Sequence, residues 1–328
     1  MSSMHLIKDI KAKDIVTEPI RKGFGRGLKS AGEKDERVVA LCADLTESTQ
    51  MHLFAEAFPE RYIEVGIAEQ NLVTTASGLS AMGKIPFCSS YAAFSPGRNW
   101  EQIRTTICLN ERPVKIIGSH AGLYTGQDGA THQMLEDLAI MRVLPHMVVI
   151  APGDSIEAEK ATLAMAKDDK NPTYLRVTRE ATPVFTTKDT PFEIGKAYVL
   201  EPGKDVSLIA TGSMTFPALL AAEMLFKDGI DAEVVHVPTI KPLDNVTILQ
   251  SAGRTKAVVT IEEHQIAGGL GGAVAELLAD EMPTLVKRLG MRDHFGETGH
   301  PPELLEHFGL TPKNIALAAH EIISRKSN

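Results

Sequence analysis

Short apolar runs rich in β-branched residues alternate with longer helical patterns along this chain, and this alternation restricts its fold more than any other feature. Buried parallel strands read as near-continuous hydrophobic runs, so strands that take turns with helices predict a doubly wound α/β sheet. In the first half, the predicted strands cover residues 37–42, 62–65, 85–90, 113–119, 147–151 and 174–177, and the predicted helices cover 19–31, 69–82, 99–109, 135–142 and 156–166.

A second, smaller alternation follows a polar stretch at residues 182–190, which we interpret as a linker. A chain of 328 residues is comfortable as two domains of about 130–190 residues each. We therefore expect two doubly wound α/β domains, at residues 14–184 and 191–328. In the second, the predicted strands are 206–211, 233–237 and 257–262, and the predicted helices are 217–227, 270–280 and 314–324.

Composition excludes several classes of protein. No apolar run reaches the ~18 residues that span a bilayer, and the first ten residues lack the apolar core of a signal peptide. The three cysteines, Cys42, Cys88 and Cys108, are odd in number and widely spaced, which argues against a disulfide framework and a zinc site. A net charge of −8 argues against a general nucleic-acid surface. We expect a cytoplasmic protein that binds neither membrane nor nucleic acid.

The motif GIAEQN, at residues 66–71, follows a predicted strand and begins a predicted helix. Ligands of open α/β sheets bind beyond the carboxyl ends of strands, so Glu69 is a candidate site residue. The alternative is an acid that only favours the positive end of a helix dipole.

The glycine-rich stretch GSHAGLYTGQDGATHQ, at residues 118–133, follows another predicted strand. Its two histidines, His120 and His132, are candidates for proton transfer or for donating to a developing oxyanion. The alternative is a loop with two partly exposed histidines. A metal site is a weak interpretation, because no cysteine or acid lies at ligand spacing.

Two further sets of residues lie near predicted element ends. Tyr91 and Phe94 come just past a strand and are suited to stacking on a planar heterocycle, although core packing is the simpler explanation when they are taken alone. Arg21, Ser48 and Arg179 are scattered in sequence and are candidates to converge on a phosphate, against the alternative of solvated surface residues.

The segment IEEHQIAGGLGGAV, at residues 261–274, is typical of a turn into a helix. Its GGLGG differs from a dinucleotide-binding GxGxxG, so we interpret the glycines as tight helix packing and His264 as structural.

These segments, in this order, resemble the pyrimidine-binding and C-terminal domains of transketolases. The resemblance extends from about Asp14 to Ile323. ADLTEST at residues 43–49, GIAEQN and SHAGLYTGQDGATHQ are specific when taken together. The resemblance implies an enzyme of the pentose phosphate pathway that uses thiamine diphosphate to transfer a two-carbon ketol unit between phosphosugars.

The resemblance also implies roles for individual residues. Glu69 matches the glutamate that bonds the aminopyrimidine nitrogen of the cofactor, and the aromatic pair matches the pocket around that ring. The remaining matches concern the sugar: His120 and His132 match histidines that bond the donor and its intermediate, Asp128 matches the acid that reads a substrate hydroxyl, and Arg21, Ser48 and Arg179 match residues that hold the sugar phosphate.

Two positions depart from the usual transketolase pattern. Gln70 stands where histidine is common, and Ala130 stands where proline is common. Deoxyxylulose-phosphate synthases share both variants, whereas His120 and the aromatic segment are closer to transketolase. Two alternatives are therefore a deoxyxylulose-phosphate-synthase-like enzyme and a transketolase for an unusual sugar phosphate. A third is a non-catalytic paralogue that only binds a partner subunit. The intact set of Glu69, His120, Asp128 and His132 argues against this third alternative.

The magnesium motif of full-length transketolases, Gly-Asp-Gly followed further on by asparagine, is not recognisable. Asp128-Gly129 is preceded by Gln127, and Gly153-Asp154 lacks the next glycine. We expect no metal ligand on this chain, and a separate N-terminal subunit of roughly 250–300 residues that binds Mg²⁺ and the diphosphate. The cofactor would then be shared between two chains, in a two-plus-two heterotetramer with a homodimer contact.

Overall fold

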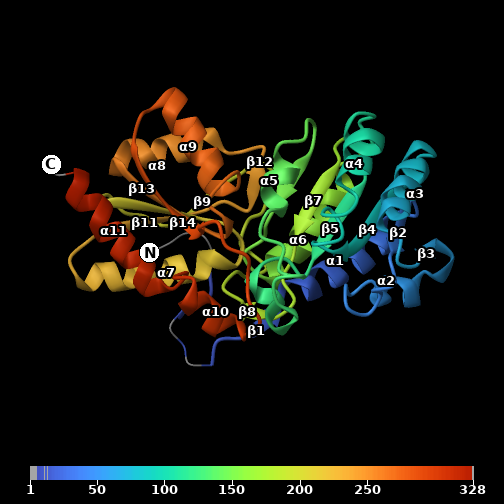
Figure 1. The fold of residues 1–328 in the computed structure, drawn as a ribbon, viewed down its shortest axis with the longest axis horizontal. Coiled ribbons are helices and arrows are strands. Elements are labelled where there is room, and N and C mark those ends of the chain that lie inside the picture. Colours follow the sequence, from blue (N-terminus) through green and yellow to red (C-terminus); the bar gives the residue numbers. More distant parts are fainter. Residues whose placement is uncertain (1–5, 11, 13, 327–328) are drawn as a thin grey trace.

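A seven-stranded sheet forms the first half of the computed structural model, which describes residues 6–10, 12 and 14–326 (Figure 1). Its central strands are parallel and buried, as the continuous hydrophobic runs predict. All six strands predicted for this half are confirmed. In spatial order the strands are β12 (Thr239–Lys241), β6 (Val148–Ile150), β7 (Thr173–Arg176), β5 (Lys115–Ser119), β4 (Ile85–Tyr91), β2 (Val38–Cys42) and β3 (Tyr62–Glu64).

Helices cover both faces of this sheet, which confirms the doubly wound prediction. One face carries α1 (Ile20–Lys34), α2 (His52–Ala57) and α6 (Ser155–Lys167), and the other carries α3 (Glu69–Ala81), α4 (Trp100–Gln102), the π-helix η2 (Ile103–Cys108) and α5 (Asp137–Arg142). Two short 3₁₀ helices, η1 (Pro59–Arg61) and η3 (Leu123–Asp128), lie in connections.

A five-stranded sheet forms the second domain. Its order is β14 (Leu285–Met291), β13 (Ala257–Gln265), β10 (Val206–Ala210), β11 (Ala232–His236) and β9 (Tyr198–Glu201), of which the sequence predicted β10, β11 and β13. η4 (Gly212–Met214), α7 (Thr215–Lys227), α10 (Pro301–His307) and α11 (Pro312–Lys326) share one hydrophobic core, and α8 (Asn245–Thr255) and α9 (Leu270–Glu281) pack on the opposite face. The predicted α7, α9 and α11 are confirmed.

The stretch at residues 182–190 connects the two sheets, but it is not a loose linker. It begins inside β8 (Ala181–Pro183), which pairs antiparallel with β1 (Thr17–Pro19). The buried Asp154 carboxylate then accepts hydrogen bonds from the main-chain N–H groups of Phe185 and Thr186, at 2.9 and 2.7 Å. One strand also joins the sheet of the other domain: β12 comes from the second half of the chain and pairs antiparallel with β6 of the first sheet.

The described part of the chain contains no helix that is both long and apolar enough to cross a bilayer. All three cysteines are free and buried in the first domain.

Glycines allow α1 to pack closely against α6. Gly23 and Gly27 lie one turn apart on α1, and a Cβ at Gly23 would stand 1.8 Å from Ser155 O. A Cβ at Gly27 would stand 2.8 Å from Thr162 Cβ. The sequence GFGRG therefore brings the two helix backbones together, because protein interiors leave no room for added atoms at such a contact.

We expect Gly23→Ala to lower the free energy of unfolding by about 1–3 kcal/mol, because the added methyl group forces α1 away from α6. Gly78→Ala is the matched control, since Gly78 lies on α3 with nothing within 4 Å of an added Cβ. Its substitution should raise the free energy of unfolding by about 0.5–1 kcal/mol through helix propensity. Urea unfolding of the two variants measures both effects. Equal changes in the free energy of unfolding would contradict this account of the contact between α1 and α6.

Candidate active site

Parallel register brings two candidate residues together. β4 ends at Tyr91 and β5 ends at Ser119, and these two residues are directly paired in the sheet. His120 follows at once, so its imidazole stacks on the Tyr91 ring with 3.8 Å between ring centroids and an interplanar angle of 27°. Residues far apart in sequence therefore meet at the carboxyl edge of the sheet, as predicted for a ligand site.

Phe94 and His132 extend this contact into an aromatic wall. The Phe94 ring lies 6.2 Å from Tyr91, and the His132 ring stands edge-on to both, 6.0 Å from Tyr91 and 5.4 Å from Phe94. Tyr91, Phe94 and His132 are each half-buried. The wall therefore presents ring surface at its open side, which plain core packing does not require.

Glu69 lies at the start of α3 with a side chain only 2% exposed. One carboxylate oxygen accepts a hydrogen bond from Arg98 Nη1 at 2.6 Å, and its main-chain carbonyl accepts one from Asn99 Nδ2 at 2.8 Å. The Arg98 guanidinium in turn lies 4.8 Å from the centre of the Phe94 ring. The buried carboxylate thus adjoins the aromatic wall through Arg98, which is itself 49% exposed.

His120 is a neutral hydrogen-bonding group. Burial, followed by the positive charges of Arg21 and Arg179, lowers the pKa of His120 to about 2. Its Nε2 lies 3.4 Å from Arg21 Nη1, and its Nδ1 lies 2.9 Å from Ser119 Oγ. Because arginine only donates, Nε2 is the acceptor and Nδ1–H donates to the Ser119 hydroxyl. The tautomer of this imidazole is thereby fixed.

Two arginines form a cationic pair next to His120. Arg21 Nη1 donates to the main-chain carbonyl of Ser48, while Arg179 Nη1 donates to Asp128 Oδ1 at 3.1 Å and to Thr125 O at 3.0 Å. Burial and then the charge of Arg179 lower the pKa of Arg21. Arg21 Nε is buried and has no hydrogen-bond partner among the described residues. Two neighbouring cations with an unsatisfied donor are suited to an anion such as phosphate.

The structure therefore joins all nine predicted site residues into one continuous set of contacts. Ser48 participates through its carbonyl in these contacts, and Asp128 joins through Arg179. Sequence reasoning missed Arg98 and Ser119. The signal for Arg98 was its place four residues after Phe94 in the aromatic segment, but its partner Glu69 is 29 positions away and no local pattern links them.

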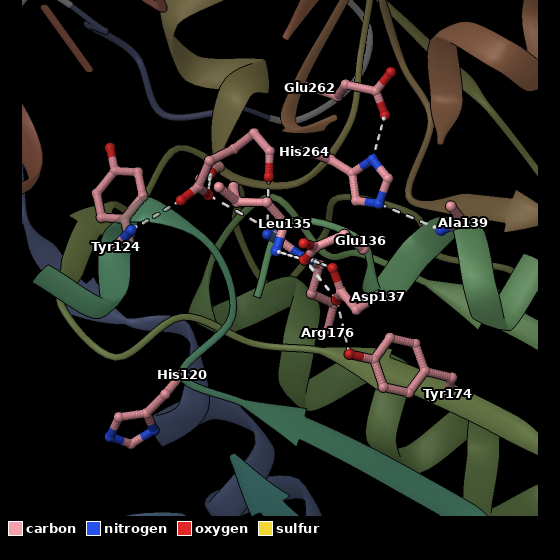
Figure 2. Close-up of polar contacts among 12 residues, drawn as sticks. His120, Tyr124, Leu135, Glu136, Asp137, Ala139, Tyr174, Arg176, Glu262 and His264 are labelled. Atoms are coloured by element: carbon pink, nitrogen blue, oxygen red, sulfur yellow. Dashed lines mark hydrogen bonds and ion pairs between the residues drawn. The ribbon is translucent and has the colours of Figure 1, made fainter. Parts of the chain in front are cut away.

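The glycine-rich segment of the second domain serves packing, as interpreted. The buried Glu262 carboxylate accepts from the N–H groups of Leu270 and Gly271, at 2.7 and 2.8 Å, where α9 begins. Burial raises the pKa of Glu262 to about 7. A Cβ at Gly269 would stand 2.0 Å from this carboxylate. His264 Nε2 accepts from Ala139 N at 3.3 Å and so contacts the first domain (Figure 2).

Across residues 6–10, 12 and 14–326, no group of three or more His, Cys, Asp and Glu side chains is arranged to hold a metal ion.

Comparison with protein families yields two matches that together cover most of the chain. The model of the transketolase pyrimidine-binding domain matches residues 18–184, and the model of the transketolase C-terminal domain matches residues 195–315. These domains imply a thiamine-diphosphate-dependent family.

Similar proteins extend over nearly the whole chain. A putative transketolase C-terminal section from Methanocaldococcus jannaschii is 45% identical over 92% of this chain and 95% of its own length. A 6-deoxy-6-sulfo-D-fructose transketolase subunit from Clostridium sp. is 43% identical over 92% of this chain and 93% of its own length. A solved structure described as a split gene transketolase, inactive beta4 tetramer, has 44% identity and a TM-score of 0.88, covering 93% of this chain and 98% of its own. The chain belongs to the transketolase family.

Proposed function

We propose that this chain is the C-terminal subunit of a split transketolase, which transfers a two-carbon ketol unit between phosphosugars together with a separate N-terminal subunit. The observation that carries the proposal is the buried Glu69 carboxylate beside an aromatic wall that continues into His120, His132 and two arginines.

The residues present fit the pyrimidine ring of thiamine diphosphate. Glu69 offers a carboxylate that is shielded from water. Among the described residues its side chain bonds the half-exposed Arg98, which can turn outward when the ring binds. Tyr91 and Phe94 offer ring faces for a planar heterocycle. In the proposal Glu69 bonds the ring nitrogen and the two aromatic residues hold the ring. When bound, the cofactor supplies an electron sink for cleaving the ketol unit.

The remaining residues orient the sugar. The neutral His120 accepts a hydrogen bond from a hydroxyl of the donor at Nε2, and the half-buried His132 donates to its carbonyl oxygen. Asp128 accepts from a substrate hydroxyl, and Arg21 and Arg179 bind the phosphate, with Ser48 at the same end of the site. The unsatisfied N–H of Arg21 supports this assignment.

A partner chain supplies the other half of the site. In the proposal the partner binds Mg²⁺ and the diphosphate, and this chain contributes two domains, at residues 14–184 and 191–328. Two copies of each chain form a heterotetramer in the reducing cytoplasm. Support comes from a relative named as a C-terminal section and from a structural neighbour described as the inactive beta4 tetramer of a split gene transketolase.

A second candidate is a related enzyme with a different donor or sugar. Gln70 and Ala130, which deoxyxylulose-phosphate synthases share, favour it, and one relative is named for a sulfonated sugar. Product analysis with pyruvate or with xylulose 5-phosphate as the donor separates the candidates. A product that contains carbon from pyruvate would favour the synthase.

We expect Glu69→Ala to lower kcat of the reconstituted two-chain enzyme by about 10²–10⁴-fold, the range for removing a proton-transfer partner. The variant should fold, because the Arg98 that it leaves unpaired is half-exposed. Glu60→Gln, a substitution of an exposed acid in η1, is the control and should keep the full rate. Unchanged turnover of Glu69→Ala would refute the catalytic assignment.

We expect Arg179→Gln to raise KM for a phosphorylated donor by about 10- to 100-fold, the size expected for charge-assisted hydrogen bonds. KM for an unphosphorylated ketose should change far less. Initial rates with both donors measure the difference, and Arg325→Gln, at an exposed arginine of α11, controls for net charge. An equal rise for the two donors would mean that Arg179 does not bind phosphate.

The isolated chain, supplied with thiamine diphosphate and Mg²⁺, should show no turnover. Activity should appear when the N-terminal chain is added and should saturate near equal molar amounts, because each site needs groups from both chains. Full activity of the isolated chain would contradict the split-subunit proposal while leaving the transketolase assignment intact.

A further inference from the structure

The loop at residues 119–133, which carries His120, Asp128 and His132, is held by the second domain as well as by the first. It turns back on itself, with Gly122 N donating to Met134 O at 2.9 Å. At its far end, Gln133 Nε2 donates to Gly126 O within the loop and to Glu297 O of the second domain, each at 2.8 Å. The loop that bears the candidate catalytic groups is therefore part of the domain interface.

Glu263, near the end of β13, directs a buried carboxylate into this loop. One oxygen accepts from the main-chain N–H of Tyr124 at 2.8 Å, and the other accepts from Ser213 Oγ at 2.9 Å and lies 3.5 Å from Arg176 Nη1. The Glu263 side chain is 1% exposed. A charged group of the second domain thus satisfies a backbone donor in the middle of the loop.

Arg176 fixes the position of this carboxylate. Its Nη2 donates to Glu263 O at 2.8 Å, and its Nε donates to Asp137 Oδ2 at 3.0 Å. Tyr174 OH donates to the same Asp137 oxygen at 2.7 Å (Figure 2). Glu263, Arg176 and Asp137 each make more than one hydrogen bond, so the Glu263 side chain has a single well-defined orientation.

The contact with Tyr124 continues to the candidate catalytic residues. Thr125, the next residue, donates from Oγ1 to His120 O at 2.6 Å. Its own carbonyl accepts from Arg179, which also holds Asp128. The loop packs tightly against the buried ion pair, since a Cβ at Gly122 would stand 2.4 Å from both Glu263 Oε1 and Arg176 Nη2.

We propose that Glu263 is a positioning residue: by holding Tyr124 N, it sets the loop conformation in which His120, Asp128 and His132 face the substrate. The inference rests on the proposed function for the roles of those three residues. It gives the second domain a part in the reaction, through the shape of the loop and without contact to substrate.

Two substitutions at this position separate the proposal from a general role in joining the domains. Glu263→Gln loses the charge opposite Arg176 but keeps an oxygen that reaches Tyr124 N. Glu263→Asp keeps the charge but is one methylene too short for that reach. If Glu263 positions the loop, the aspartate variant should disturb the loop more than the glutamine variant does. If Glu263 serves only as a charge partner between the domains, the order should be reversed.

The readouts are hydrogen exchange of the loop peptides in the full chain and kcat of the reconstituted enzyme. We expect Glu263→Asp to speed exchange across residues 120–128 by about tenfold, as for the loss of one hydrogen bond, and to lower kcat more than it changes KM. Glu263→Gln should remain near wild type in both. The matched control is Glu233→Asp, at a buried acid that pairs with Arg254 within the second domain and should leave the loop unchanged.

The opposite rank order, equal effects of the two Glu263 variants, or faster loop exchange in Glu233→Asp would each overturn the proposal. Exchange is measured without turnover, so an inactive reconstituted wild type would count against the proposed function and leave the test of Glu263 in place.

Discussion

Parallel strand pairing determines where this chain places the side chains of its candidate site. β2, β4, β5 and β7 run side by side in one direction, so their carboxyl ends meet at one edge of the sheet. The register sets Tyr91 opposite Ser119, and the stacking of Tyr91 on His120 follows from it. A slip of one residue would turn every side chain of a strand to the other face. The aromatic wall and the cationic pair thus depend on the hydrophobic runs that fix this register.

Those runs are also why much of the fold could be predicted from the sequence. Central strands are buried on both faces, so β2 is apolar throughout, and the polar residues of β4 and β5 stand toward the strand ends, at Ser89 and Ser90 and at Lys115 and Ser119. β14 escaped prediction because it is an edge strand, in which Lys287 and Arg288 interrupt the pattern. β12 has three residues, and its partner β6 belongs to the other half of the chain. Local patterning carries no information about such a partner.

Some residues of the candidate site could likewise be predicted from the sequence, and others could not. Residues just past strand ends, such as Glu69 and His120, could be found because topology alone gathers them. Arg98 and Glu263 could not, because their roles come from pairing with groups 29 and 139 positions away. The sequence pattern predicts a strand that ends at residue 262. In the structure β13 continues to Gln265, because Glu262 caps α9 and Glu263 meets Arg176.

Parts of the candidate site are exposed to solvent, which fits the proposed second chain covering this edge of the sheet. Stabilisation of developing charge by fixed dipoles needs a site from which water is excluded. Here the Glu69 carboxylate is buried, yet its partner Arg98 is 49% exposed and the apolar side chain of Ile67, two residues before Glu69, is 76% exposed. Burying such a side chain contributes roughly 1.5–3 kcal/mol, so a partner that covers this edge gains association energy while it dries the site. In the proposed two-chain enzyme, assembly and catalytic competence are therefore the same event.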